Sequence, residues 1–248
     1  MAVITEKIYL YGKHALFESL SAKPEAIKKV FLDDNASKDS ELMKLLDKNK
    51  IPISKLKGSD VSSVGSNAVH QGVIALVNTE ALYSPLSVID DILKKEKNPC
   101  IVLLDELQDP HNVGAIIRSA VAFGASAIIM PEHNQSPITG TVIKTSVGMV
   151  FRTSIVKVGN VNQTVRALKD KGFWVYGLVM NGDTTLKNAQ FDTPTLFVVG
   201  NESDGIREKT LELCDIKLSI PMSPSCESLN AATASSVVLY EWSRSNLE

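Results

Sequence analysis

The chain has 248 residues, of which 44% are hydrophobic and 22% are charged, and its formal net charge is −2. This length predicts two domains, and the composition excludes a disordered chain or a small disulfide-stapled scaffold. The three cysteines, Cys100, Cys214 and Cys226, share no metal-ligand spacing, so we expect a reducing compartment and no bound metal. Without a signal pattern or an apolar run of membrane length, the sequence predicts a cytoplasmic protein with no membrane partner.

The charges are spread unevenly along the chain. Residues 1–80 hold eleven Lys and ten acids, for a net charge of +1, and residues 99–248 hold twelve basic and fifteen acidic residues, for a net charge of −3. Neither block is a strong polycation. A nucleic-acid partner must therefore be met by a local patch rather than by the overall field of the protein.

The first 78 residues alternate between helical and strand patterns, which predicts a small α/β/α domain. We expect strands at 27–32, 51–53 and 72–77, helices at 12–20 and 40–49, and a helical turn at 61–64. His70 fits a contact to a polar ligand and a turn cap equally well. Residues 79–98 lack strand character and contain Ser84-Pro85 before a short amphipathic helix, so we interpret them as a linker.

Residues 99–248 alternate between apolar strands and helices. We expect strands at 101–105, 127–130, 154–158, 173–180, 195–199 and 216–220. Continuously apolar strands separated by helices predict a parallel sheet with helices on both faces. In the first of these helices we expect Asn112 as the N-cap, Arg118 away from the apolar stripe, and Gly124 just past the end.

Three polar segments follow strands of this sheet, and parallel sheets place ligands at the carboxyl ends of their strands. They are DPHN after the first strand, GNESDG after 195–199, and IPMSPSCESLN after the last, where Ser228 is the expected N-cap of the final helix. Each alone fits an ordinary turn. The sequence contains neither GxGxxG nor GxxxxGK[ST], which removes the usual dinucleotide and P-loop cradles.

Taken together, these segments resemble the three motifs of the SpoU (TrmH-type) branch of the SPOUT RNA 2′-O-methyltransferases. The first motif matches at 109–125, the second at 197–206 and the third at 218–232, although Ser223-Pro224 departs from the family pattern in the third. Residues 11–20 and 70–77 resemble the L30e-like RNA-binding domain of the 23S rRNA guanosine-2′-O-methyltransferase (RlmB-like) subgroup. The resemblance divides the chain into a substrate-binding domain (1–78), a linker (79–98) and a catalytic domain (99–248).

The resemblance implies a deep trefoil knot in the catalytic domain, a homodimer with active sites near the subunit interface, and S-adenosylmethionine as cofactor. It also implies which residues contact this cofactor, largely through backbone groups. Carried onto this sequence, they are Gly200, Ile220, Leu229, Met222 and Leu178.

The catalytic positions of the family fall on Asn112, Arg118, Glu202, Ser228 and Asn230. The family would assign activation of the 2′-hydroxyl to Arg118. Because the pKa of Arg lies above ~12, it is a poor general base. We therefore expect Arg118 to bind a phosphate and to stabilise the developing alkoxide, with Glu202 and Asn112 orienting Arg118 or the ribose.

The sequence thus predicts S-adenosylmethionine-dependent 2′-O-methylation of a guanosine in large-subunit rRNA, either free or in a pre-ribosomal particle. One alternative keeps the chemistry and changes the target to tRNA or to another rRNA nucleotide. Another is a non-catalytic RNA-binding or ribosome-assembly factor, which the intact catalytic positions disfavour. Because the N-terminal domain is only weakly basic, RNA binding requires its eleven lysines to gather on one face.

Overall fold

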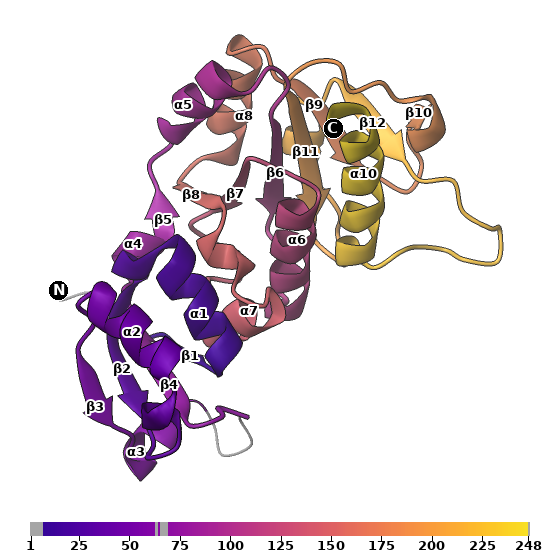
Figure 1. The fold of residues 1–248 in the computed structure, drawn as a ribbon. Coiled ribbons are helices and arrows are strands. Elements are labelled where there is room, and N and C mark those ends of the chain that lie inside the picture. The colour runs from indigo at the N-terminus through magenta and orange to yellow at the C-terminus, as the bar shows by residue number, and fades with distance from the viewer. Residues whose placement is uncertain (1–6, 63, 65–68, 248) are drawn as a thin grey trace, which may run out of the picture. The chain divides into compact units, whose positions relative to one another are not determined.

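The structure is a computed structural model that describes residues 7–62, 64 and 69–247. The chain forms two compact units, shown in Figure 1. Unit 1 comprises 1–83 and 138–152, and unit 2 comprises 84–137 and 153–248. The grouping of 138–152 with the N-terminal unit has no signal in the sequence. The functional boundary at 79–98 stays a prediction.

Unit 1 is built on a four-stranded sheet in the order β1-β4-β2-β3. Strands β1 and β2 are antiparallel to β4, whereas β3 is parallel to β2. His70 caps a turn, since its Nδ1 accepts the backbone N–H of Gly72 at 3.1 Å. The strands are β1 (Tyr9–Tyr11), β2 (Ile27–Leu32), β3 (Ile53–Lys55) and β4 (Val73–Val77), and the helices are α1 (Lys13–Ala22), α2 (Ser40–Lys48), α3 (Gly58–Ser62), α4 (Thr79–Leu82) and α7 (Gly140–Thr145).

The large sheet has eight strands in the order β10-β12-β9-β11-β6-β7-β8-β5, and the registered pairs from β10 to β8 are all parallel. The predicted α/β fold with a parallel sheet is therefore confirmed. The trefoil knot stays a prediction. The strands are β5 (Tyr83–Ser84), β6 (Cys100–Asp105), β7 (Ala127–Pro131), β8 (Ser154–Val158), β9 (Trp174–Leu178), β10 (Thr184–Thr185), β11 (Thr195–Gly200) and β12 (Ile216–Ser219).

Three short strands differ from the sequence-based expectation. Strand β5 lies in the segment expected to lack strand character, and the sequence predicts neither β1 nor β10. Strands β5 and β10 have two residues and β1 has three, and each pairs at an outer edge of its sheet. Two or three residues are too few for the alternation on which strand prediction depends.

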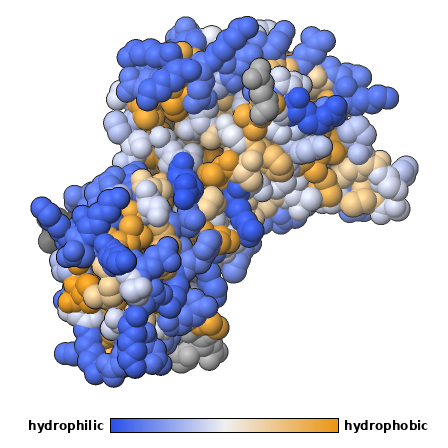
Figure 2. Space-filling model, viewed as in Figure 1, coloured by the Kyte–Doolittle hydropathy of each residue, from blue (hydrophilic) through white to orange (hydrophobic). Residues whose placement is uncertain are grey.

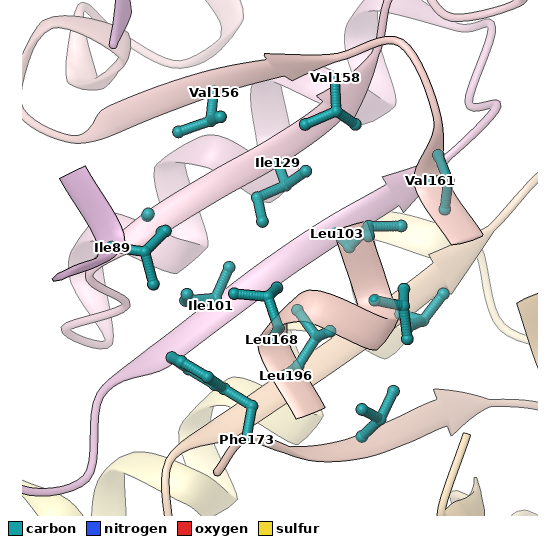
Figure 3. Close-up of a cluster of buried hydrophobic side chains, with 14 of the residues drawn as sticks. Ile89, Ile101, Leu103, Ile129, Val156, Val158, Val161, Leu168, Phe173 and Leu196 are labelled. Carbon is teal, nitrogen blue, oxygen red and sulfur yellow. The ribbon is translucent and has the colours of Figure 1, made fainter. Parts of the chain in front are cut away.

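Helices cover both faces of the large sheet. On one face, α5 (Val88–Lys95) and α8 (Val161–Asp170) pack on alternate residues of the strands, and Figure 3 shows this buried cluster. On the other face, α6 (Pro110–Ala122) and α10 (Ala231–Asn246) lie side by side (Figure 1). The short helix α9 (Glu208–Leu211) follows β11. No helix in the described ranges is long and apolar enough to cross a membrane.

The N-caps of two helices differ from those predicted. Helix α6 begins at Pro110 with Asp109 as N-cap, because proline fits the first helical position, where no N–H is needed. The expectation that Asn112 caps this helix is wrong, although Gly124 ends it as expected with a φ of +75°. Helix α10 is capped by Asn230, not by Ser228. Asn112 therefore does not use its side chain to cap α6, whereas Asn230 uses its side chain to cap α10.

A buried ion pair holds the end of β6. Asp105 is 0% exposed, and its carboxylate accepts hydrogen bonds from Arg207 through the backbone N at 3.0 Å, Nε at 3.0 Å and Nη2 at 2.6 Å. Arg207 Nη1 also donates to Glu106 at 2.7 Å. A carboxylate is buried at low cost only when its charge is paired and hydrogen-bonded. Arg207 therefore fastens the segment after β11 to the end of β6.

We predict that Arg207→Ala lowers the free energy of unfolding by about 3 kcal/mol, because the buried Asp105 carboxylate loses its positive partner and both guanidinium donors and keeps only the backbone N–H of residue 207. Urea denaturation measures the effect. The control is Arg244→Ala, whose pair with Glu241 is exposed and should contribute less than about 0.5 kcal/mol. Equal losses in the two variants would contradict this role for Arg207.

Candidate functional site

A cavity of about 500 Å³ opens at the carboxyl ends of β9, β11 and β12. All five residues expected to contact a cofactor line it: Leu178, Gly200, Ile220, Met222 and Leu229. They come from the ends of three strands and from the loop that leads into α10. The cavity thus lies where ligands bind in parallel α/β sheets.

The loop after β11 forms one wall of this cavity and depends on a glycine. A Cβ on Gly200 would lie 2.2 Å from the backbone C of Gly205 and the backbone N of Ile206, so no larger residue fits. Backbone hydrogen bonds between Asn201 and Gly205, at 2.9 and 3.0 Å, close the loop. The resulting tight turn presents backbone groups and Glu202 at the cavity.

Three of the predicted catalytic residues form a continuous chain of hydrogen bonds. Asn112 Nδ2 donates to Glu202 Oε1 at 2.7 Å, and Asn230 Nδ2 donates to Asn112 Oδ1 at 2.9 Å. Asn112 is buried in the first part of α6, whereas Glu202 and Asn230 line the cavity. This chain of hydrogen bonds therefore joins segments from all three sequence motifs.

Helix capping fixes the direction of this chain. Asn230 Oδ1 accepts the backbone N–H groups of Ala232 at 2.9 Å and Thr233 at 3.3 Å, which leaves its amide NH₂ group as the donor to Asn112. The Asn112 amide then accepts from Asn230 and donates to the Glu202 carboxylate. Because a carboxylate accepts and an amide does both, one arrangement satisfies all three groups.

Two predicted catalytic residues, Arg118 and Ser228, take no part in this chain of hydrogen bonds. Arg118 lies six residues beyond Asn112 on α6, or ~9 Å along the helix axis. It is exposed and makes no hydrogen bond or ion pair with any residue that the structure describes. Ser228 lines the cavity, and its backbone carbonyl accepts the Cys226 thiol at 3.4 Å.

The structure adds supporting residues that the sequence reasoning missed. Asn201 Nδ2 donates to the carbonyl of Glu106 at 2.8 Å, and Arg207 binds Asp105 and Glu106, so both ends of the Glu202 loop are fastened to β6. The signal was present, since an acidic residue that closes an otherwise apolar strand needs a partner. Its partner could not be named, because about one hundred residues separate the two in sequence.

The cysteines near this sheet carry no evident chemistry. Burial, together with the charge of Asp215, raises the pKa of the Cys214 thiol to about 12, so it stays protonated at neutral pH. Its Sγ lies 2.9 Å from where a Cβ on Gly177 would be, which indicates tight packing. No group of three or more His, Cys, Asp or Glu side chains in the described ranges could hold a metal ion.

Comparisons with known proteins identify the family of the chain. Residues 99–240 match the model of the SpoU rRNA Methylase family, and residues 9–82 match a model described as RNA 2′-O ribose methyltransferase substrate binding. A putative TrmH family tRNA/rRNA methyltransferase of Staphylococcus epidermidis is 34% identical over 95% of both chains. The 23S rRNA (guanosine-2′-O-)-methyltransferase RlmB of Nitrosomonas europaea is 33% identical, over 96% of this chain and 92% of that protein.

Solved structures agree as well. The SpoU methyltransferase AviRb of Streptomyces viridochromogenes, in complex with AdoMet, superposes with a TM-score of 0.79 at 26% identity, covering 96% of this chain and 90% of that one. An AdoMet-bound rRNA methyltransferase of Sinorhizobium meliloti, 23% identical, shares the fold with a TM-score of 0.82 and covers 98% of this chain and 89% of its own. The chain belongs to the SpoU rRNA methylase family of RNA 2′-O-ribose methyltransferases.

Proposed function

We propose that the protein transfers the methyl group of S-adenosylmethionine to the 2′-hydroxyl of a guanosine in large-subunit (23S) rRNA. The observation that carries this proposal is the Glu202–Asn112–Asn230 hydrogen-bond chain at the cavity. The name of the Nitrosomonas europaea relative supports a guanosine of 23S rRNA as the target. Such a substrate, free or in a pre-ribosomal particle, would place the protein in the cytoplasm.

The cavity fits a nucleoside-based cofactor. Its volume of about 500 Å³ lies within the roughly 300–1,000 Å³ typical of small-molecule sites. Leu178, Ile206 and Leu211 supply apolar walls suited to an adenine ring, while Glu202 and Asn230 supply a polar edge. When bound, the cofactor supplies an electrophilic methyl group on a sulfonium. The residues that line the cavity would hold it beside Glu202 and Asn230.

Glu202 and its two amide partners would orient the acceptor ribose. Asn112 occupies only Oε1 of the carboxylate, and Oε2 has no hydrogen-bond partner among the residues that the structure describes. Oε2 is therefore available to accept a hydrogen bond from the 2′-hydroxyl of a ribose at the cavity. Holding the attacking oxygen in line with the methyl group lowers the barrier by removing the entropy cost of their encounter.

Arg118 would stabilise negative charge on the RNA rather than remove the proton of the 2′-hydroxyl. Its exposed guanidinium has no carboxylate to neutralise it among the described residues, and it presents a planar fork that matches a phosphate. A phosphate bound there would position the RNA backbone. The same positive charge would stabilise the alkoxide that develops as the 2′-hydroxyl loses its proton.

A homodimer is part of the proposal. The surface of unit 2 over much of α10 is paler than the strongly hydrophilic surface over α5 and α8, as Figure 2 shows. Two large side chains of α10 are exposed, Val237 at 37% and Tyr240 at 54%. Apolar side chains of this size on an exposed helix face suit a subunit interface. A second subunit against α10 would bring its own residues close to the third motif.

The first test is methyl transfer from labelled S-adenosylmethionine to RNA from cells that lack this protein, with the modified nucleoside identified and mapped. We expect label in a 2′-O-methylguanosine of the large rRNA, and its loss in Arg118→Ala. Label in tRNA, which the name of the Staphylococcus epidermidis relative keeps as the second candidate, would retain the chemistry and replace the substrate. No label in RNA or pre-ribosomal particles would reject the enzyme.

A second prediction separates the roles considered for Arg118. We expect Arg118→Lys to reduce kcat/KM for RNA by about tenfold or more, because an ammonium keeps the charge but loses the bidentate fork. The matched control is Arg166→Lys, since Arg166 is exposed on α8 at the opposite face of the sheet. Near-parental turnover in Arg118→Lys would show that fork geometry is not used.

A further inference from the structure

The sheet of unit 1 gathers aromatic and basic residues on one face. Directly paired residues of neighbouring strands point to the same face, and residues two apart along a strand do so too. By this register, six residues share a face in two adjacent rows: Tyr9, Leu76 and Lys29 in one, and Tyr11, Ile74 and Phe31 in the other.

The two faces of this sheet differ in burial. Leu10, Val30 and Ala75, which alternate with the six residues, are 0% exposed and belong to the core. Tyr9, Tyr11, Phe31, Lys29 and Leu76 are instead half-buried, and only Ile74, between the two rings of its row, is fully buried. The rings of Tyr11 and Phe31 therefore retain surface that a ligand can reach.

Each of these two rings carries a lysine. Lys29 Nζ lies 5.3 Å from the centre of the Phe31 ring, and Lys144 Nζ lies 5.1 Å from the centre of the Tyr11 ring. Neither lysine forms an ion pair with a carboxylate in the described part of the chain. Lys144 comes from α7, which packs against β1. Unit 1 as a whole carries thirteen Lys and Arg against ten Asp and Glu.

We propose that this face, defined by Tyr9, Tyr11, Phe31, Lys29 and Lys144, binds an unpaired strand of the RNA substrate. The inference rests on the proposed function, which requires RNA as the ligand. Aromatic rings beside cations are the means by which proteins hold single strands, with bases stacked on the rings and cations on the phosphates.

The chemistry of the face favours an unpaired strand over a duplex. A lysine over a solvent-accessible part of a ring is held only weakly, so a base can take its place and the ammonium can move to a neighbouring phosphate. Bases in a duplex are already stacked on one another and cannot reach the rings. Loops and other unpaired segments of a structured RNA offer such bases.

The test measures binding of the full-length protein to a mixed-sequence single-stranded RNA of about 16 nucleotides and to the duplex with its complement. We expect Tyr11→Leu and Phe31→Leu each to weaken single-strand binding about tenfold, since a stacked base is lost, with little change for the duplex. Phe31→Tyr keeps the ring and should keep the affinity. Lys29→Gln should lower the slope of log affinity against log salt by about one.

Controls separate this surface from the fold and from catalysis. Lys44→Gln removes an exposed lysine from α2 and should leave the salt slope unchanged. Thermal unfolding and S-adenosylmethionine binding should match the parent in every variant. Unchanged single-strand binding in Phe31→Leu and Lys29→Gln would overturn the inference, even if the parent methylates RNA. If the parent transfers no methyl group but the variants still bind the single strand more weakly than the parent does, this binding surface is supported and the proposed enzyme activity is rejected.

Discussion

The hydrogen-bond chain from Glu202 through Asn112 to Asn230 is the interaction on which the site depends. It spans 90 residues in one direction and 118 in the other, and it ends on the backbone N–H groups that begin α10. Because the capping oxygen of Asn230 is already used, the amide of Asn112 has one orientation that satisfies both neighbours. The beginning of α10, the first turn of α6 and the loop after β11 are thereby placed together.

A second set of contacts fastens the loop after β11 to the end of β6. Asp105 is fully buried at the end of β6, where it pairs in register with Gly200, and it accepts three hydrogen bonds from Arg207. Asn201 is fastened to the carbonyl of Glu106. A loop fixed at both ends loses little entropy when a ligand binds, which is the advantage of preorganisation. The wall of the cavity and the carboxylate of Glu202 share this support.

Much of the fold was predictable from local pattern, and the site was less so. Apolar strands such as 101–105 identified the parallel sheet, and its carboxyl ends identified the region of the cavity. Pairing at a sheet edge is not encoded locally, so the edge strands β1, β5 and β10 were missed. Helix starts were misplaced because Asp109-Pro110 and Asn230 compete with neighbouring residues that also suit a cap. The isolation of Arg118 from the hydrogen-bond chain depends on three-dimensional packing, which no spacing reveals.

The most direct test of this account is a double-mutant cycle on methyl transfer at saturating S-adenosylmethionine with Asn112→Ala, Glu202→Gln and both together. If Asn112 acts by holding the Glu202 carboxylate, the double variant should be no slower than the slower single variant, with a coupling of at least about 1 kcal/mol. Thermal unfolding of all four proteins separates catalysis from stability. Additive losses in rate would mean that the two residues act independently and would contradict the hydrogen-bond chain as the organising element of the site.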